Sequence, residues 1–345
     1  MTAPSSALSA PLDTARILER CRELVGPALA DAVGRLHPWV GEMAAYSFGW
    51  CEVGGAAAVA SGGKGVRQAL AVLGAEASGA PGRAGVPAAV AVELVHAFSL
   101  LHDDIMDGDQ ARRGRPAVWR AYGTGPAVLA GDGLFALAVG TLAAAPAGGR
   151  AVRMLSVALG DLVHGQADDL LFAGRPWTGR GRVRPAEYRS MAEGKTGSLL
   201  GCSLALGALL GGAAPPTVAA LDRAGRQLGV AFQIVDDMLG IWGDSAVTGK
   251  PVHADLRERR KTFPVLAALA STAPETRRLA VLLETGDAPE EAAALIDAAG
   301  GRTAALAEAH RHITTAETVL ADAPLDDRAR EELRSLVGFL VRREQ

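Results

Sequence analysis

The feature that most constrains this chain is a cluster of aspartates at the end of an apolar stretch. Asp103, Asp104, Asp107 and Asp109 stand within seven residues. The residues before them are apolar at helical spacing, so the pattern predicts one helix over 90–106 that carries the acids at its C-terminal end. Asp103 and Asp107 then share a face, where like charges repel and also oppose the helix dipole. Such an end needs a cation or full solvation. Hard oxygen ligands without a nearby cysteine favour Mg²⁺.

A second acidic cluster makes full solvation the weaker explanation. Gln233, Asp236 and Asp237 lie near the end of another apolar helix, predicted over 218–242. An isolated acidic cluster is usually a solvated helix end. Two aspartate pairs, each at the end of an apolar helix, are hard to explain as two solvated faces, and we expect both to bind a cation.

Composition favours one all-α fold. Apolar residues make up 49% of the 345 residues and aromatic residues only 4%, which suits closely packed helices. We therefore predict a single large helical bundle around one central cavity, spanning residues 13–345. The Ala/Ser/Pro-rich residues 1–12 are expected to be a disordered lead-in. The net charge of −3 offers no general attraction for nucleic acid.

Two further observations concern the compartment. Three widely spaced cysteines, without an apparent signal peptide, indicate reduced thiols and a cytoplasmic protein. Residues 196–221 contain no charge and are long enough to cross a bilayer. Five glycines and two prolines interrupt this segment, and flanking aromatic anchors are missing. We therefore predict a buried central helix and no transmembrane segment.

With these motifs in place, the sequence resembles the trans-isoprenyl diphosphate synthases, the polyprenyl synthetase family. Asp103-Asp104-x-x-Asp107 followed by Arg112-Arg113-Gly matches the first aspartate-rich motif of that family, and the second acidic cluster matches its second motif in part. The resemblance runs from about residue 62 to residue 264. It implies the all-α isoprenoid synthase fold, and a homodimer.

The resemblance also implies two diphosphate sites. A glycine-rich turn with a basic residue at a helix start suits an anion on physical grounds, and the chain has Gly62-Gly63-Lys64-x-x-Arg67. The family uses this pattern for isopentenyl diphosphate, and the implied site comprises Lys64, Arg67, His96 and Arg113. The implied site for the allylic diphosphate comprises Arg112, Lys195, Lys250 and, matched less closely, Lys261.

The implied chemistry is ionisation of the allylic diphosphate, assisted by Mg²⁺ on Asp103, Asp107 and Asp236. Thr196 is implied to lie beside the carbocation that forms, and the remaining catalytic positions are Asp104, Gln233 and Asp237. Two residues depart from the family pattern. Gly240 stands where many members have a third aspartate. This difference is expected to affect metal binding more than the type of reaction, and Asp244 is a candidate to compensate. Gln68 replaces a proline after Arg67.

Product length is implied to depend on the residues one turn before Asp103. Ser99 and Phe98 lie roughly 6–7.5 Å along the helix axis from that acid. Family members use bulky residues at this level to stop the growing chain. Only one of these two positions is aromatic, so the sequence resembles enzymes that make geranylgeranyl diphosphate (C20). Farnesyl diphosphate (C15) is the alternative product. The alternative to a role in product length is that Phe98 is an ordinary core residue.

Two other function classes stay open. A terpene cyclase has the same fold and a similar acidic motif but needs no isopentenyl site, so Lys64, Arg67, His96 and Arg113 argue against it. A non-catalytic subunit of a hetero-oligomeric synthase is compatible with Gly240 and Gln68. The retention of both aspartate pairs argues against it.

Overall fold

The computed structural model describes residues 13–58, 63, 65–244, 251–286 and 288–341. The predicted lead-in at residues 1–12 and the predicted site residues Lys64 and Lys250 lie outside the described residues. The helices are α1 (Thr14–Gly34), α2 (Pro38–Phe48), α3 (Val66–Ala77), η1 (Gly82–Gly85), α4 (Val86–Asp107), α5 (Val118–Tyr122), α6 (Thr124–Ala143), α7 (Gly148–Ala173), α8 (Pro185–Ala192), η2 (Glu193–Gly197), α9 (Ser198–Leu210), α10 (Pro215–Trp242), α12 (Ala254–Arg257), α13 (Phe263–Ala270), α14 (Thr276–Thr285), α15 (Pro289–Ala298), α16 (Gly301–Asp322) and α17 (Asp327–Val341).

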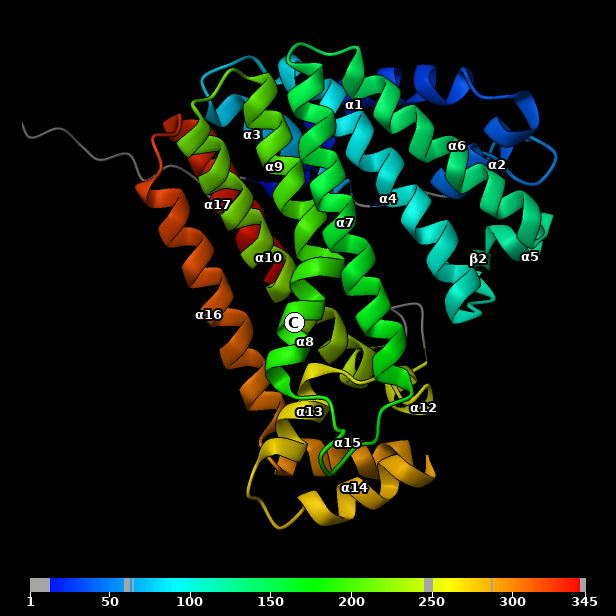
Figure 1. Ribbon diagram of the computed structural model, residues 1–345, viewed down its shortest axis with the longest axis vertical. Helices are drawn as coiled ribbons and strands as arrows, with labels where there is room; N and C mark the ends of the chain where they lie inside the picture. Colours follow the sequence, from blue (N-terminus) through cyan, green and yellow to red (C-terminus); the bar gives the residue numbers. More distant parts are fainter. Residues whose placement is uncertain (1–12, 59–62, 64, 245–250, 287, 342–345) are drawn as a thin grey trace, which may run out of the picture.

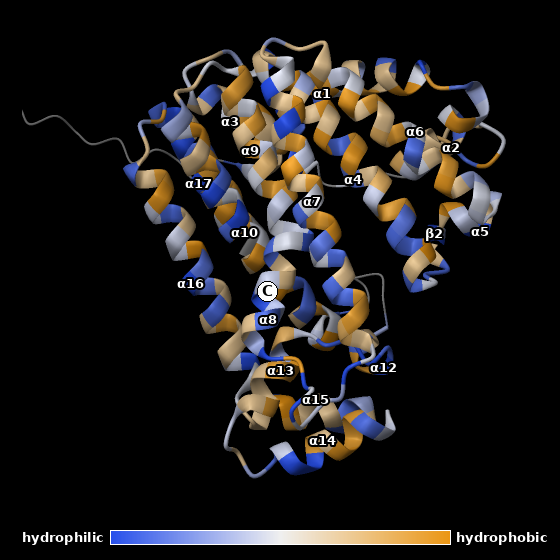
Figure 2. Cartoon of the chain, in the orientation of Figure 1, coloured by the Kyte–Doolittle hydropathy of each residue, from blue (hydrophilic) through white to orange (hydrophobic). Residues whose placement is uncertain are grey.

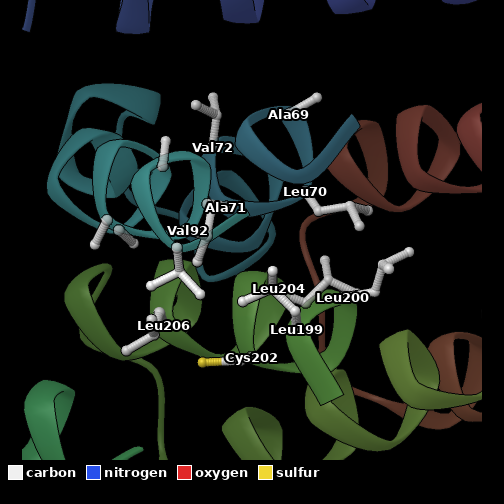
Figure 3. Packing of buried hydrophobic residues seen from close by; sticks show 14 of the residues in the cluster. Ala69, Leu70, Ala71, Val72, Val92, Leu199, Leu200, Cys202, Leu204 and Leu206 are labelled. Carbon is white, nitrogen blue, oxygen red and sulfur yellow. The ribbon is translucent and has the colours of Figure 1, made fainter. Parts of the chain in front are cut away.

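The all-α prediction is confirmed. In the described part of the chain, the only sheet is a hairpin of two-residue strands, β1 (Ala111–Arg112) and β2 (Arg115–Pro116). The long helices lie side by side with α9 in the interior, where it packs against α3, α4, α7 and α10 (Figure 1). Figure 3 shows Leu70 and Val72 of α3 with Val92 of α4 packed above Leu199 and Leu204 of α9.

The uncharged segment is the buried helix that the sequence predicts. Every residue of α9 from Ser198 to Leu209 is buried, so no position there tolerates a charge. The segment is not one helix to residue 221, because α9 ends at Leu210 and Pro215 begins α10. By length and composition alone, residues 82–107 and 124–143 are apolar enough to cross a bilayer. The first of these stretches contains α4, whose lower end is hydrophilic in Figure 2.

Glycines bring the inner helices into close contact. A Cβ added at Gly207 of α9 would overlap the carbonyl oxygen of Ala71 in α3. Gly225 and Gly229 of α10 likewise face the backbone of Gly201 and Gly197. Backbones at this distance leave no room for a methyl group, and the surrounding core is rigid. The glycine-rich composition is therefore a packing requirement of α9.

We predict that Gly207→Ala destabilises the protein by about 1–3 kcal/mol, because the extra methyl group overpacks the contact with α3. The matched control is Gly160→Ala on α7, where an added Cβ meets nothing within 4 Å. This control should gain up to about 1 kcal/mol from helix propensity. Denaturant unfolding of both variants measures the difference. Equal midpoints would contradict the packing argument.

Candidate active site

The first acidic cluster ends α4 as predicted. The helix stops at Gly108, which adopts a left-handed φ of 71° and accommodates the turn that follows. Asp104 points inward and is only 3% exposed, and its carboxylate accepts a hydrogen bond of 2.8 Å from Nε of Arg112. Asp103 and Asp107 lie on the other side of the helix end. One acid of the pair is therefore bound by the protein, and its neighbour is available to a ligand.

Asp103 is the acid that most needs a cation. Burial, together with the nearby charge of Asp107, raises its pKa to about 6, although Lys195 acts in the opposite direction. A carboxylate with these neighbours is stabilised in its charged form when a cation arrives. The influence of Lys195 also shows that the predicted residues of α4 and η2 face the same space.

The small hairpin after α4 separates the two adjacent arginines. Its turn residues, Arg113 and Gly114, both have left-handed φ values, of 53° and 74°. This backbone is typical of a tight two-residue hairpin turn. Arg112 reaches back to Asp104, whereas the guanidinium of Arg113 lies against Gly63, where an added Cβ would be 2.7 Å from it. Arg112 and Arg113 are adjacent in the sequence but therefore lie in two different parts of the site.

Arg67, His96 and Arg113 come together as the sequence predicts. A guanidinium nitrogen of Arg67 lies 3.2 Å from Nε2 of His96. Burial and then the charges of Arg67 and Arg113 keep the pKa of His96 well below its usual value, so the ring is neutral and accepts from Arg67. The nearby acid that opposes these cations is the partly buried Glu93, which also accepts a hydrogen bond of 3.1 Å from the Gln68 backbone. A proline at position 68 could not donate this bond.

The second acidic cluster also has one acid that the protein holds by hydrogen bonds. Asp237 is buried and accepts three of them, from the Tyr188 hydroxyl (2.5 Å), the Phe263 amide (2.9 Å) and the Gln233 amide (3.2 Å). Burial, followed by the nearby Asp255, raises its pKa to about 7. The charge of Asp236 acts on Arg67, where it opposes the lowering of the pKa by burial. Asp237 therefore connects α8, α10 and the start of α13.

Lys195 and Thr196 lie in a π-helical turn, η2, which continues directly from α8 into α9. Lys195 therefore lies within a continuous helical segment and not at a helix N-terminus. The wider turn is typical of functional sites. The ammonium of Lys195 lies 2.5 Å from the Asp169 carboxylate, and the Thr196 hydroxyl donates to Gln233 at 2.7 Å. Both polar side-chain atoms of the buried Gln166 on α7 lack a hydrogen-bond partner in the described part of the chain.

The structure does not bring Lys261 to the other site residues. Its ammonium lies 3.3 Å from the centre of the Trp177 ring, in an apolar cluster below the site. Burial lowers its pKa to about 8. The neighbouring Arg260 takes the expected place, because its guanidinium lies 3.7 Å from Asp107. The sequence shows four basic residues here but not which one faces the acids.

Gly240 leaves space that another acid fills. A Cβ at Gly240 would overlap the carboxylate of Asp255, which projects from α12. Asp255 is 8% exposed, and its carboxylate is 4.0 Å from Arg260. The acid beside the second cluster therefore comes from a separate segment. Asp244, the candidate from the sequence, lies exposed beyond the end of α10.

The donor set fits a hard divalent cation. The two helix ends offer carboxylate oxygens alone, from Asp103 and Asp107 on α4 and Asp236 on α10, and Arg260 is already drawn to Asp107. No three acidic, histidine or cysteine side chains converge on one point among the described residues. Mg²⁺ takes one or two carboxylates and completes its shell with water and phosphate oxygens, so the carboxylates of Asp103 and Asp107 are a donor set that fits it.

The two residues implied in product length differ in their surroundings. The Phe98 ring contacts α6, where its centre lies 5.7 Å from that of Phe135. The Ser99 hydroxyl donates to the His96 carbonyl oxygen at 2.9 Å, so it is held against its own helix.

Asp255, Glu93 and Tyr188 are site residues that the sequence did not single out. Asp255 lies close to Arg257, Arg259 and Arg260 in a charged segment that was visible in the sequence, where an arginine could substitute for Lys261. Tyr188 gave no signal of its own.

Comparison with known proteins identifies the family. The family model for "Polyprenyl synthetase" matches residues 50–299. Mycobacterium tuberculosis has a (2E,6E)-farnesyl diphosphate synthase that is 42% identical, over 96% of this chain and 94% of that protein. Its geranylgeranyl diphosphate synthase is 44% identical, over 91% of each chain. The crystal structure of a polyprenyl synthetase from Streptomyces coelicolor superposes with a TM-score of 0.89 at 46% identity, covering 95% of this chain and 100% of that one.

These matches span nearly the whole chain, and they agree with the acidic helix ends and basic groups of the site. The protein belongs to the polyprenyl synthetase family and is a prenyltransferase of the prenyl diphosphate synthase type.

Proposed function

We propose that the protein condenses isopentenyl diphosphate with allylic diphosphates and gives geranylgeranyl diphosphate (C20) as its main product. The observation that carries the proposal is a pair of separate cationic groups beside the acidic helix ends. Arg67 and Arg113, with the neutral His96 beside Arg67, form one group, and Arg112, Lys195 and Arg260 form the other. A reaction that brings two diphosphates together needs two such places.

The two groups have different tasks. Arg112, Lys195 and Arg260 bind the allylic diphosphate and stabilise the pyrophosphate that leaves with both bonding electrons. Arg67 and Arg113 hold isopentenyl diphosphate so that its double bond attacks the allylic cation. Mg²⁺ held by Asp103, Asp107 and Asp236 would neutralise the diphosphate charge. A proton is then lost, which the released pyrophosphate is placed to accept.

The neutral polar groups position the reacting centre. The Thr196 hydroxyl donates to Gln233, which in turn donates to Asp237, so the orientation of the Gln233 amide is fixed. The amide and hydroxyl oxygens offer partial negative charge without a nucleophile that would trap the cation. The apolar walls exclude water, which would otherwise do so.

The length of the product follows from a single aromatic residue at the level of Phe98 and Ser99. The relatives named above include both farnesyl and geranylgeranyl synthases at nearly equal identity, so similarity alone does not separate C15 from C20. The small Ser99 leaves one side of α4 without bulk, which favours the longer product.

The test is an incubation of the purified protein with Mg²⁺, isopentenyl diphosphate and dimethylallyl, geranyl or farnesyl diphosphate in turn. We expect all-trans C20 alcohol as the longest main product after dephosphorylation, identified by mass. A C15 end product would select the farnesyl alternative. Cyclic hydrocarbon from an allylic diphosphate alone would indicate a cyclase, and no turnover by folded protein would indicate a non-catalytic subunit.

We predict that Arg260→Gln lowers kcat/KM for the allylic substrate by about 10–100-fold, the range for a lost hydrogen bond to a charged group. Lys261→Gln is the matched control, since its ammonium packs on Trp177 and away from Asp107. The control should change kcat/KM by less than about threefold. Steady-state kinetics with both substrates measure this. A larger loss in the Lys261 variant would restore the assignment made from the sequence.

We also propose a homodimer formed through α6. Asp132 is the one charged residue of this helix, yet only a third of its most apolar 18-residue stretch is buried. Val128, Leu129 and Phe135 are 38%, 51% and 38% exposed on it. An apolar surface of this kind is typical of a protein interface, and two-fold dimers are the commonest assembly.

We predict a mass in solution of twice the 35.4 kDa chain, and a monomer for Leu129→Asp. The matched control is Val281→Asp on α14, which is 61% exposed at the opposite end of the molecule (Figure 1). Light scattering after size-exclusion chromatography measures the mass. A monomeric wild type, or dissociation by the control alone, would rule out α6 as the interface.

A further inference from the structure

Aromatic rings connect the acid-bearing helix to α6. Phe98 and His102 are four residues apart on α4 and share a face, with ring centres 4.7 Å apart in an edge-on arrangement. On α6, Phe135 lies with its ring centre 5.7 Å from that of Phe98. The Phe98 ring is therefore held from two sides, by its own helix and by the neighbouring one.

The fit between these helices depends on Gly131. This residue lies one turn before Phe135 on α6, and an added Cβ would overlap the ring of His102. Nε2 of His102 also lies 3.4 Å from the carbonyl oxygen of Val128. His102 follows Phe98 on α4, whereas its contact Gly131 precedes Phe135 on α6, so the two helices are antiparallel here. The order of these contacts fixes the helices in register, and with it the position of the Phe98 ring.

The aromatic contact extends to the surface of the subunit. Phe135 is 38% exposed, so the described residues of its own subunit leave its outer side partly uncovered, on the face of α6 proposed for the dimer interface. Phe98 is itself partly buried and packs against the main core. If Phe135 were truncated, the space beside Phe98 would open toward the outside of α6, and the Phe98 ring would be free to rotate away from the interior.

We propose that Phe135 is a specificity-determining residue that acts through Phe98. It holds the Phe98 ring in the position that stops the growing prenyl chain. The inference rests on the proposed elongating function and on Phe98 as its stop. It adds a residue from the outer face of a different helix, so product length depends on the packing of α6 against α4 as well as on the residue before the acids.

The test compares Phe135→Ala, Phe98→Ala, the double variant and the wild type. Each is incubated with Mg²⁺, isopentenyl diphosphate and farnesyl diphosphate, and the products are measured by mass after dephosphorylation. We expect Phe135→Ala to raise the proportion of products longer than the wild-type main product at least tenfold. Phe98→Ala should shift it further. The double variant should equal Phe98→Ala, because Phe135 acts only through that ring.

Two additional variants keep the result interpretable. Leu129→Ala removes apolar surface from the same helix, outside the aromatic contact, and should leave product length unchanged. Phe135→Leu retains bulk and should give a smaller shift in the same direction, which also serves if the alanine variant does not fold. Circular dichroism and the mass in solution confirm that the compared variants share the wild-type fold and assembly.

The outcomes separate the inference from the function on which it rests. A wild type that does not elongate any primer overturns the proposed function, and the inference with it. Elongation with longer products from Phe98→Ala but not from the Phe135 variants overturns the inference alone. Unchanged products from both alanine variants remove Phe98 as the stop. A double variant with longer products than Phe98→Ala would show that Phe135 does not act through Phe98.

Discussion

The structure depends on the electrostatic balance at two acidic helix ends. Asp103 and Asp107 on α4 and Asp236 and Asp237 on α10 would repel one another in a partly buried space without opposing charge. The protein offsets this with cations from elsewhere in the chain, through Arg112 on Asp104 and Arg260 near Asp107. In each pair, one acid is fixed by hydrogen bonds, Asp104 to Arg112 and Asp237 to Tyr188, Gln233 and the Phe263 amide.

This charge balance requires helices that approach closely and hold their positions. The glycines of η2, α9 and α10 allow that approach, since Gly197 and Gly229 bring the two backbones into contact beside Thr196. The same contact places Thr196 within hydrogen-bond distance of Gln233. Small residues in the interior therefore determine where polar groups meet at the site.

Most of the architecture was predictable from the sequence, because long apolar periodic segments determine helices reliably. The acid-bearing ends of α4 and α10, and the burial of α9, follow from such patterns. Positions that depend on local geometry were not predictable. Lys261 and Arg260 are adjacent in a short irregular segment, where a rotation of one residue decides which side chain faces the acids. The π-helical turn at Lys195 likewise has no periodicity of its own to reveal it.

The carboxylate of Asp255 beside Gly240 has a consequence for local stability. An acid on α10 would be held by a helix of 28 residues, whereas Asp255 stands on α12, a helix of four residues. Helices this short are not stable in isolation, so α12 persists only through its contacts. Asp255 therefore adds its negative charge beside the second acidic cluster only while α12 stays folded. Fluctuations that open α12 would change the charge of the site without unfolding the bundle.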